Sequence, residues 1–235
     1  MRCVDYFGIN CNRVTAKDGL LAYYIFIGVI DNALDSAHIE TGRLVLEYLK
    51  APLPWVGEAY ASSDVKIVTE TLKSNISEES YFSIQEKLGR LYQRVLRERG
   101  ATSIRELIRF RKAVGALTAD VSYLLIQSSL DREHKGLRRF MKKVGAVGCL
   151  IDSVIDLGAD RRLGLLRFQP SIADYAQLIR HTMIASLRVL FMYPALFGLF
   201  LPAIVDNLRD RFGRRQPVAS GRIVPHGKDQ LARVA

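Results

Sequence analysis

Residues 147–160 read VGCLIDSVIDLGAD and place aspartates at positions 152, 156 and 160, four residues apart. On an α-helix, side chains at this spacing lie on one face, about 6 Å apart. The stretch lies in a proline-free interval between Pro54 and Pro170, in which apolar residues recur at spacings of three and four. This periodicity is typical of long helices and argues against a β-sandwich or barrel. The sequence therefore predicts an all-α fold.

A second pair of aspartates, Asp31 and Asp35, has the same spacing and follows the apolar run YIFIGVI at residues 24–30. Carboxylates in apolar surroundings are costly unless they are protonated or neutralised by cations. Asp206 and Asp210 share the spacing, but interleaved arginines offer them surface ion pairs. The candidate cation ligands are therefore the rows at 31/35 and at 152/156/160.

The expected helices begin at recognisable caps and end at glycine or proline. Asp18 is a candidate N-cap, Ser103 with Glu106 forms a capping box, and Ser171 precedes the last helix. The expected helices cover about residues 18–50, 59–73, 79–99, 103 onward, 135–160 and 171 onward. Gly145 and Gly148 are expected to be close-packing positions.

At 235 residues and 49% hydrophobic composition, the chain suits a single domain, which we place at residues 1–213. Residues 214–235 are expected to form a basic tail. Of the net charge of +10, residues 207–235 carry seven Lys or Arg against two Asp. Such a tail can attract nucleic acid or anionic lipid. Because no zinc-finger or RNA-binding signature accompanies it, we expect no nucleic-acid partner.

Residues 189–205, VLFMYPALFGLFLPAIV, form an uncharged run of 17 residues. The run is shorter than the roughly 20 residues of a membrane-spanning helix and contains Pro194 and Pro202. It is either a buried terminal helix or a peripheral membrane contact, for which Arg188 and the basic tail would meet lipid headgroups. Three cysteines without a secretory leader favour a cytoplasmic location.

Facing rows of aspartates on two helices suggest a specific chemistry. Mg²⁺ takes one or two carboxylates together with phosphate oxygens, so two such rows can bind a diphosphate. Neutralising a leaving diphosphate allows an allylic carbon–oxygen bond to ionise, and apolar helices shield the carbocation from water. Aromatic residues could stabilise that cation or simply belong to the core; the candidates are Trp55, Tyr60, Tyr81, Phe82, Tyr92 and Tyr123.

Both motifs resemble those of class I isoprenoid synthases. Ile30–Asp35 is similar to the first DxxxD-type motif of squalene and phytoene synthases, and Leu150–Arg162 resembles the second. The longer string through Phe168 is similar to the second motif of large terpene synthases of the tetraprenyl-β-curcumene synthase type. The 121-residue offset between Asp31 and Asp152 suits the architecture of squalene and phytoene synthases.

The resemblance implies an antiparallel helical bundle of the isoprenoid synthase type and a Mg²⁺-dependent terpene synthase or prenyltransferase acting on a prenyl diphosphate. It implies that the metal ligands are Asp31, Asp35, Asp152, Asp156 and Asp160, of which the first four are catalytic, and that Arg161 meets the diphosphate.

Two alternatives stay open. Phytoene synthases usually carry an arginine before the second motif, where this chain has Ile151. The protein could therefore be a degenerate family member that binds a prenyl lipid or diphosphate without chemistry. The apolar run and the basic tail favour the other alternative, a membrane-associated helical interaction protein.

Overall fold

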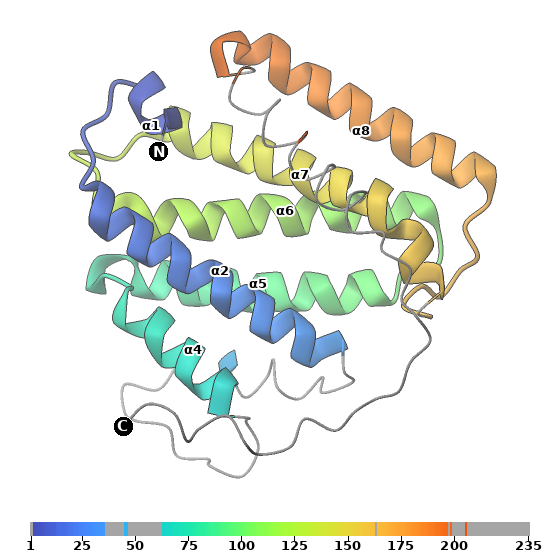
Figure 1. The fold of residues 1–235 in the computed structure, drawn as a ribbon, viewed down its shortest axis with the longest axis horizontal. Coiled ribbons are helices and arrows are strands. Elements are labelled where there is room, and N and C mark those ends of the chain that lie inside the picture. Colours follow the sequence, from blue (N-terminus) through green and yellow to red (C-terminus); the bar gives the residue numbers. More distant parts are fainter. Residues whose placement is uncertain are drawn as a thin grey trace, which may run out of the picture. The chain divides into compact units, whose positions relative to one another are not determined.

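A computed structural model describes residues 2–35, 45–46, 63–162, 164–196, 198 and 205. Within these residues the protein is all-helical and has no strand, as predicted (Figure 1). The helices are α1 (Arg2–Tyr6), α2 (Arg13–Asp35), α4 (Ser63–Ser74), α5 (Glu78–Arg99), α6 (Ile104–Gln127), α7 (Lys135–Arg162), α8 (Ile172–Met192) and the 3₁₀ turn η1 (Pro194–Leu196). The chain divides into two compact units, Met1–Leu196 and Phe197–Ala235. The expected boundary between domain and tail, at 213/214, lies outside the described residues.

Helix α6 is the central element of the first unit. Thirteen of its 24 residues are buried, and it packs against α2, α5, α7 and α8. Helices α5 to α8 follow one another in alternating directions, joined by short loops (Figure 1). Helix α2 packs against α4 and α6. The two helices that carry the predicted aspartate rows, α2 and α7, therefore both lie against α6.

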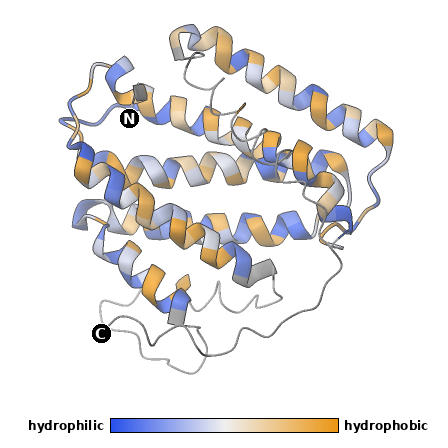
Figure 2. Cartoon of the chain, in the orientation of Figure 1, coloured by the Kyte–Doolittle hydropathy of each residue, from blue (hydrophilic) through white to orange (hydrophobic). Residues whose placement is uncertain are grey.

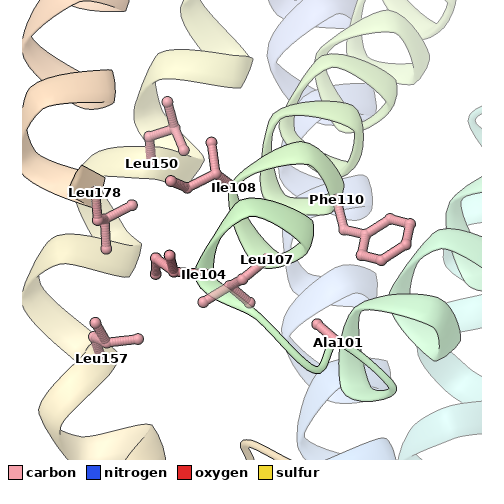
Figure 3. Close-up of a cluster of buried hydrophobic side chains, with 8 residues drawn as sticks. All are labelled: Ala101, Ile104, Leu107, Ile108, Phe110, Leu150, Leu157 and Leu178. Atoms are coloured by element: carbon pink, nitrogen blue, oxygen red, sulfur yellow. The ribbon is translucent and has the colours of Figure 1, made fainter. Parts of the chain in front are cut away.

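A hydrophobic cluster joins α6 to α7 and α8 (Figure 3). Leu150 and Leu157 of α7 and Leu178 of α8 are each at most 1% exposed. They pack with residues of α6 and the preceding loop, which are Ala101, Ile104, Leu107, Ile108 and Phe110. Leu150 and Leu157 are seven residues apart, so they bury one stripe of α7 while Asp152 and Asp156 lie on other faces.

The first long helix starts earlier than predicted. Asp18 is not its N-cap, because α2 begins at Arg13 and the Asn12 side chain accepts a hydrogen bond from the Thr15 amide at 3.3 Å. Asparagine caps a helix as well as aspartate does, so the sequence offered two starts. The predicted continuation of this helix to residue 50 lies largely outside the described residues.

The predicted helix starts near residues 79, 103, 135 and 171 are confirmed. The start expected near residue 59 lies outside the described residues. The Ser103 side chain accepts a hydrogen bond from the Glu106 amide at the start of α6. The Glu106 carboxylate binds the Thr102 amide instead of completing the box with Ser103. Ser171 and Asp174 form a complete capping box at the start of α8.

The predicted buried terminal helix over 189–205 is wrong for the part that the structure describes. Helix α8 ends at Met192, because Pro194 disfavours a helical conformation at Tyr193, whose φ is −140° and ψ is 60°. Phe191 is 79% exposed. Most of the run beyond residue 196 lies outside the described residues. Among the described helices, none combines the length and apolar composition that crossing a membrane requires.

Helices α6 and α7 meet at a contact between two glycines, Gly115 and Gly145. A Cβ atom built on Gly115 would lie 2.1 Å from the Gly145 carbonyl oxygen and 2.7 Å from the Cys149 Cβ. Only the absence of a side chain allows this approach. The prediction that Gly145 is a close-packing position is confirmed. Gly148 is different, because a Cβ there would meet nothing within 4 Å.

We therefore predict that Gly115→Ala lowers the free energy of unfolding by about 1–3 kcal/mol, because the new methyl group forces the two backbones apart. Urea denaturation measures this loss. The matched control is Gly89→Ala in α5, where a Cβ has open space. That change should raise stability by about 0.5–1 kcal/mol. Equal effects of the two substitutions would contradict the role of the glycine contact.

Asp120 of α6 joins three helices through ion pairs. Its side chain is 1% exposed and lies 2.6 Å from Lys87 Nζ of α5 and 2.6 Å from Arg138 Nε of α7. Lys142 Nζ lies 3.9 Å away. Burial raises the pKa of Asp120, but hydrogen bonds from Arg138 and Lys87 outweigh it and hold the pKa below its usual range. The carboxylate therefore stabilises the fold while it is ionised.

Asp120→Asn should lower the free energy of unfolding by about 3 kcal/mol at pH 7, because it leaves the lysine and arginine partners without a countercharge. The pKa of Asp120 is lower in the folded protein than in the unfolded chain, where it is about 3.9. Ionised Asp120 therefore stabilises the fold above about pH 3.9, and this stabilisation is lost as the pH falls through the folded pKa. The deficit of the variant should therefore shrink below about pH 4. Thermal unfolding across pH 3–7 measures the difference in stability between the variant and the wild type, and Asp64→Asn, at an exposed position, is the control. A deficit independent of pH would contradict the assignment.

Candidate functional site

An apolar cavity of about 460 Å³ opens among α2, α5, α6 and α7. Ligand-binding cavities in proteins usually have volumes of about 300–1,000 Å³, so the space suits a small organic molecule. The apolar lining residues are Tyr24, Phe26, Ile27, Ile30, Val45, Leu46, Leu88, Leu91, Tyr92, Val95, Val114 and Ala119. Gly115, Gly145 and Gly148 also line it, so the close contact of α6 with α7 forms part of the wall.

Two predicted aspartates from different helices line this cavity. Asp31 lies near the C-terminal end of α2, and Asp152 lies in the second half of α7. Both are exposed, which leaves them accessible at the cavity surface. The sequence separates them by 121 residues, and the fold brings both to one cavity.

A second, smaller cavity of about 210 Å³ adjoins the first. The two share four lining residues, which are Asp31, Val95, Glu98 and Arg111. Asp156 and Asp160 line only the smaller cavity. Four of the five predicted ligands therefore surround two adjoining spaces. Asp35 is the last residue of α2, and its side chain lies outside the described part of the structure.

Arg111 of α6 occupies the boundary between the cavities. Its Nε lies 2.7 Å from Glu98 Oε1 of α5, and its Nη2 donates a hydrogen bond to Asp160 Oδ2 at 3.3 Å. Its side chain is 27% exposed, so part of the guanidinium remains accessible. One cation thus links three helices at the centre of the acidic region.

The charges of the described residues that line the smaller cavity do not balance. Asp31, Glu98, Asp156 and Asp160 oppose Arg99 and Arg111, which leaves a net charge of −2 when all six are ionised. Burial raises the pKa of Glu98; Arg111 lowers it, and Asp31 and Asp160 raise it further, with a net upward shift. Burial also raises the pKa of the Cys149 thiol to about 11, so Cys149 is not a nucleophile at neutral pH.

The carboxylate oxygens of these aspartates are suitable ligands for a hard divalent cation. Carboxylate oxygens are the ligands of Mg²⁺, which keeps several waters and takes few protein ligands. Within the described residues, no three acidic, histidine or cysteine side chains already converge closely enough to hold an ion on their own. A Mg²⁺ site here would thus use one or two carboxylates from each helix and complete its shell with water or phosphate oxygens.

Other predicted site residues lie elsewhere. Arg161 is exposed in the last turn of α7 and is absent from the lining of both cavities. Among the six aromatic candidates, Tyr92 lines the larger cavity. Phe82 is 79% exposed on α5, and the buried Tyr123 hydroxyl accepts a hydrogen bond from the His134 amide. Trp55 and Tyr60 lie outside the described residues.

Glu98 and Arg111 are functional candidates that the sequence analysis missed. A signal was present, because each interrupts an apolar stripe. Arg111 lies four residues after buried Leu107 and four before buried Gly115. Glu98 lies seven residues after buried Leu91. Charged residues on the core-facing side of two neighbouring helices predict a buried ion pair.

No protein-family model, curated protein or solved structure matches this chain. Function must therefore be inferred from the residues and the geometry of the site.

Arg111→Met should lower the free energy of unfolding by about 3 kcal/mol at pH 7, because it leaves Glu98 and Asp160 without their shared cation. Without Arg111 the folded pKa of Glu98 rises further above its unfolded value of about 4.3. A raised carboxyl pKa costs stability as pH increases, so the deficit should be smaller at pH 4.5 than at pH 7.

Urea denaturation at the two pH values measures this difference. Arg90→Met is the matched control, because Arg90 forms an exposed ion pair with Glu86 on α5. Its cost should stay within about 0.5 kcal/mol at both pH values. An Arg111→Met deficit that is equally large at pH 4.5 and pH 7 would refute the pairing with Glu98.

Proposed function

We propose that the protein is a Mg²⁺-dependent class I terpene or prenyl synthase with a helical bundle of the isoprenoid synthase type. The observation that carries the proposal is that Asp31 of α2 and Asp152 of α7 line one apolar cavity. An anionic rim beside an apolar interior suits a substrate with a diphosphate at one end and a hydrocarbon chain at the other. Allylic prenyl diphosphates are such substrates.

The proposed metal ligands are Asp31 and Asp35 on α2, and Asp152, Asp156 and Asp160 on α7. The net negative charge of the smaller cavity supports this assignment, because an anionic diphosphate would be repelled unless cations accompanied it. When bound, Mg²⁺ would neutralise the charge that develops on the departing diphosphate.

Arg111 is the proposed protein cation for the same diphosphate. A guanidinium donates in a fixed fork that matches phosphate oxygens, and Arg111 lines both cavities. Its position offsets the lack of an arginine before the second motif, where Ile151 stands. Arg161, predicted for this role from the sequence, lies in the last turn of α7 and lines neither cavity, so we assign the contact with the diphosphate to Arg111. Glu98 would orient Arg111 through their ion pair.

The apolar cavity would bind the prenyl chain and exclude water. In the proposed reaction, the allylic carbon–oxygen bond breaks and the diphosphate leaves with the electron pair, so a carbocation remains on the chain. Tyr24, Phe26 and Tyr92 line the cavity and could stabilise the cation by their ring faces. The electron pair of a double bond in the same chain, or in a second substrate, would then form a bond to this cation, and the resulting cation would lose a proton.

The test is the release of inorganic diphosphate from prenyl diphosphates of ten to twenty-five carbons, with Mg²⁺ or with chelator. We expect release that requires the metal and falls by at least about 100-fold in Asp31→Asn and Asp152→Asn, because each variant removes a carboxylate ligand of the Mg²⁺ that would neutralise the departing diphosphate. Asp64→Asn, an exposed substitution on α4, should retain the wild-type rate. Wild-type rates in Asp31→Asn and Asp152→Asn, with folding verified by circular dichroism, would contradict the proposal.

A second candidate is a degenerate member that binds a prenyl diphosphate without turnover. The hydrogen bond between Arg111 and Asp160 favours it, because that pair already satisfies one predicted metal ligand. Calorimetric binding of a non-ionisable thiolodiphosphate analogue, with no diphosphate release from any allylic substrate, would establish this candidate in place of the enzyme.

A further inference from the structure

Helix α8 presents a long apolar stripe to solvent. Ile179, Met183, Leu187 and Phe191 are spaced by four and are between 43% and 79% exposed. Ile172, seven residues before Ile179, is 90% exposed. At a rise of about 1.5 Å per residue, the stripe from residue 172 to 191 is about 29 Å long. In Figure 2, hydrophobic positions recur along the whole of α8.

This stripe is separate from the face by which α8 joins the fold. Leu178 and Thr182 are the buried residues of α8, and the helix packs through that side against α7 and α6. Single exposed apolar residues are normal on a protein surface, but a continuous stripe of this length marks an interaction site.

A basic groove lies along one side of α8, between α8 and α6. Among the described residues that line it, Arg105, Arg109, Lys112 and Arg180 are charged, His181 lies beside them, and none is acidic. Burial lowers the pKa of His181, and the charges of Lys112 and Arg180 lower it further. Arg188, one turn before Met192, is also exposed. The groove thus offers four fixed positive charges to an anionic partner.

We propose that α8 is a docking surface for a lipid bilayer that contains anionic lipids. The apolar stripe would enter the boundary between headgroups and acyl chains, and the groove between α6 and α8 would bind headgroup phosphates. A helix with exposed apolar residues on one face and flanking cations is typical of peripheral membrane attachment. The surface is distinct from the acidic cavities, and it shares only residues 189–192 with the apolar run 189–205.

Charge complementarity selects the bilayer over a second copy of the chain. A two-fold dimer through the stripe would bring two grooves of like charge close to one interface, which costs interaction energy. An anionic bilayer surface instead attracts each lysine or arginine that approaches it.

The experiment measures binding of the full chain to sedimented vesicles of phosphatidylcholine, with and without added phosphatidylglycerol. We expect binding that is stronger with phosphatidylglycerol and weakens as salt is raised. Met183→Glu with Leu187→Glu should weaken it by about tenfold or more, because charged side chains replace the inserted apolar ones. Arg105→Glu with Arg180→Glu should weaken it by about 10- to 100-fold and abolish the preference for phosphatidylglycerol.

Two matched controls separate this surface from general effects. Phe82→Glu replaces an exposed apolar residue on α5, and Lys135→Glu with Arg139→Glu reverses two exposed charges on α7. Both should bind vesicles as the wild type does. Binding that survives Met183→Glu with Leu187→Glu would overturn the proposal and assign attachment to the basic tail. Absence of vesicle binding, together with a dimer in light scattering that those two substitutions dissociate, would overturn it in favour of a second copy.

Discussion

The backbone contact between Gly115 and Gly145 sets the geometry on which the site depends. In an antiparallel pair that meets at these two residues, position 111 of α6 lies opposite position 149 of α7. Arg111 accordingly interacts with Cys149. Its guanidinium also donates a hydrogen bond to Asp160, which lies eleven residues beyond Cys149 on α7. A side chain at either glycine would separate the helices and change this register. The close approach therefore both anchors the core and places the acidic face of α7 beside the cavity.

Electrostatics at the site follow from that geometry. Four acidic groups from α2, α5 and α7 line the smaller cavity with two arginines, Arg99 and Arg111, and burial already raises the pKa of Glu98. An excess of carboxylates in a partly buried space is stable only with protons or added cations. By contrast, Asp120 lies among three basic side chains and is a structural ion pair. The charges of the neighbouring side chains thus separate the structural Asp120, which is surrounded by basic groups, from the aspartates of the cavities, which lie among other acidic groups.

Much of the fold and part of the site follow from local sequence patterns. Apolar periodicity and the caps at Ser103 and Ser171 predicted α6 and α8, and the four-residue spacing identified the aspartates that share the cavities. Asp18 was a wrong cap because Asn12 competes for the same role. Arg111 and Glu98 each interrupt an apolar stripe, but their pairing joins different helices, and the spacing within one helix does not show which residues pair. The exposed stripe of α8 is likewise invisible until the buried face of that helix is known.

In the proposed enzyme, the carboxylates of α2 and α7 act together on one metal ion and one diphosphate. A double-mutant cycle tests this shared site. Electron paramagnetic resonance measures the binding of Mn²⁺ to each variant in the presence of inorganic diphosphate. We expect Asp31→Asn and Asp152→Asn each to weaken Mn²⁺ binding, with a combined effect smaller than the sum of the two, because both residues would hold the same ion. Fully additive effects, or Mn²⁺ binding unchanged by either substitution, would show that the two helices do not share a metal site.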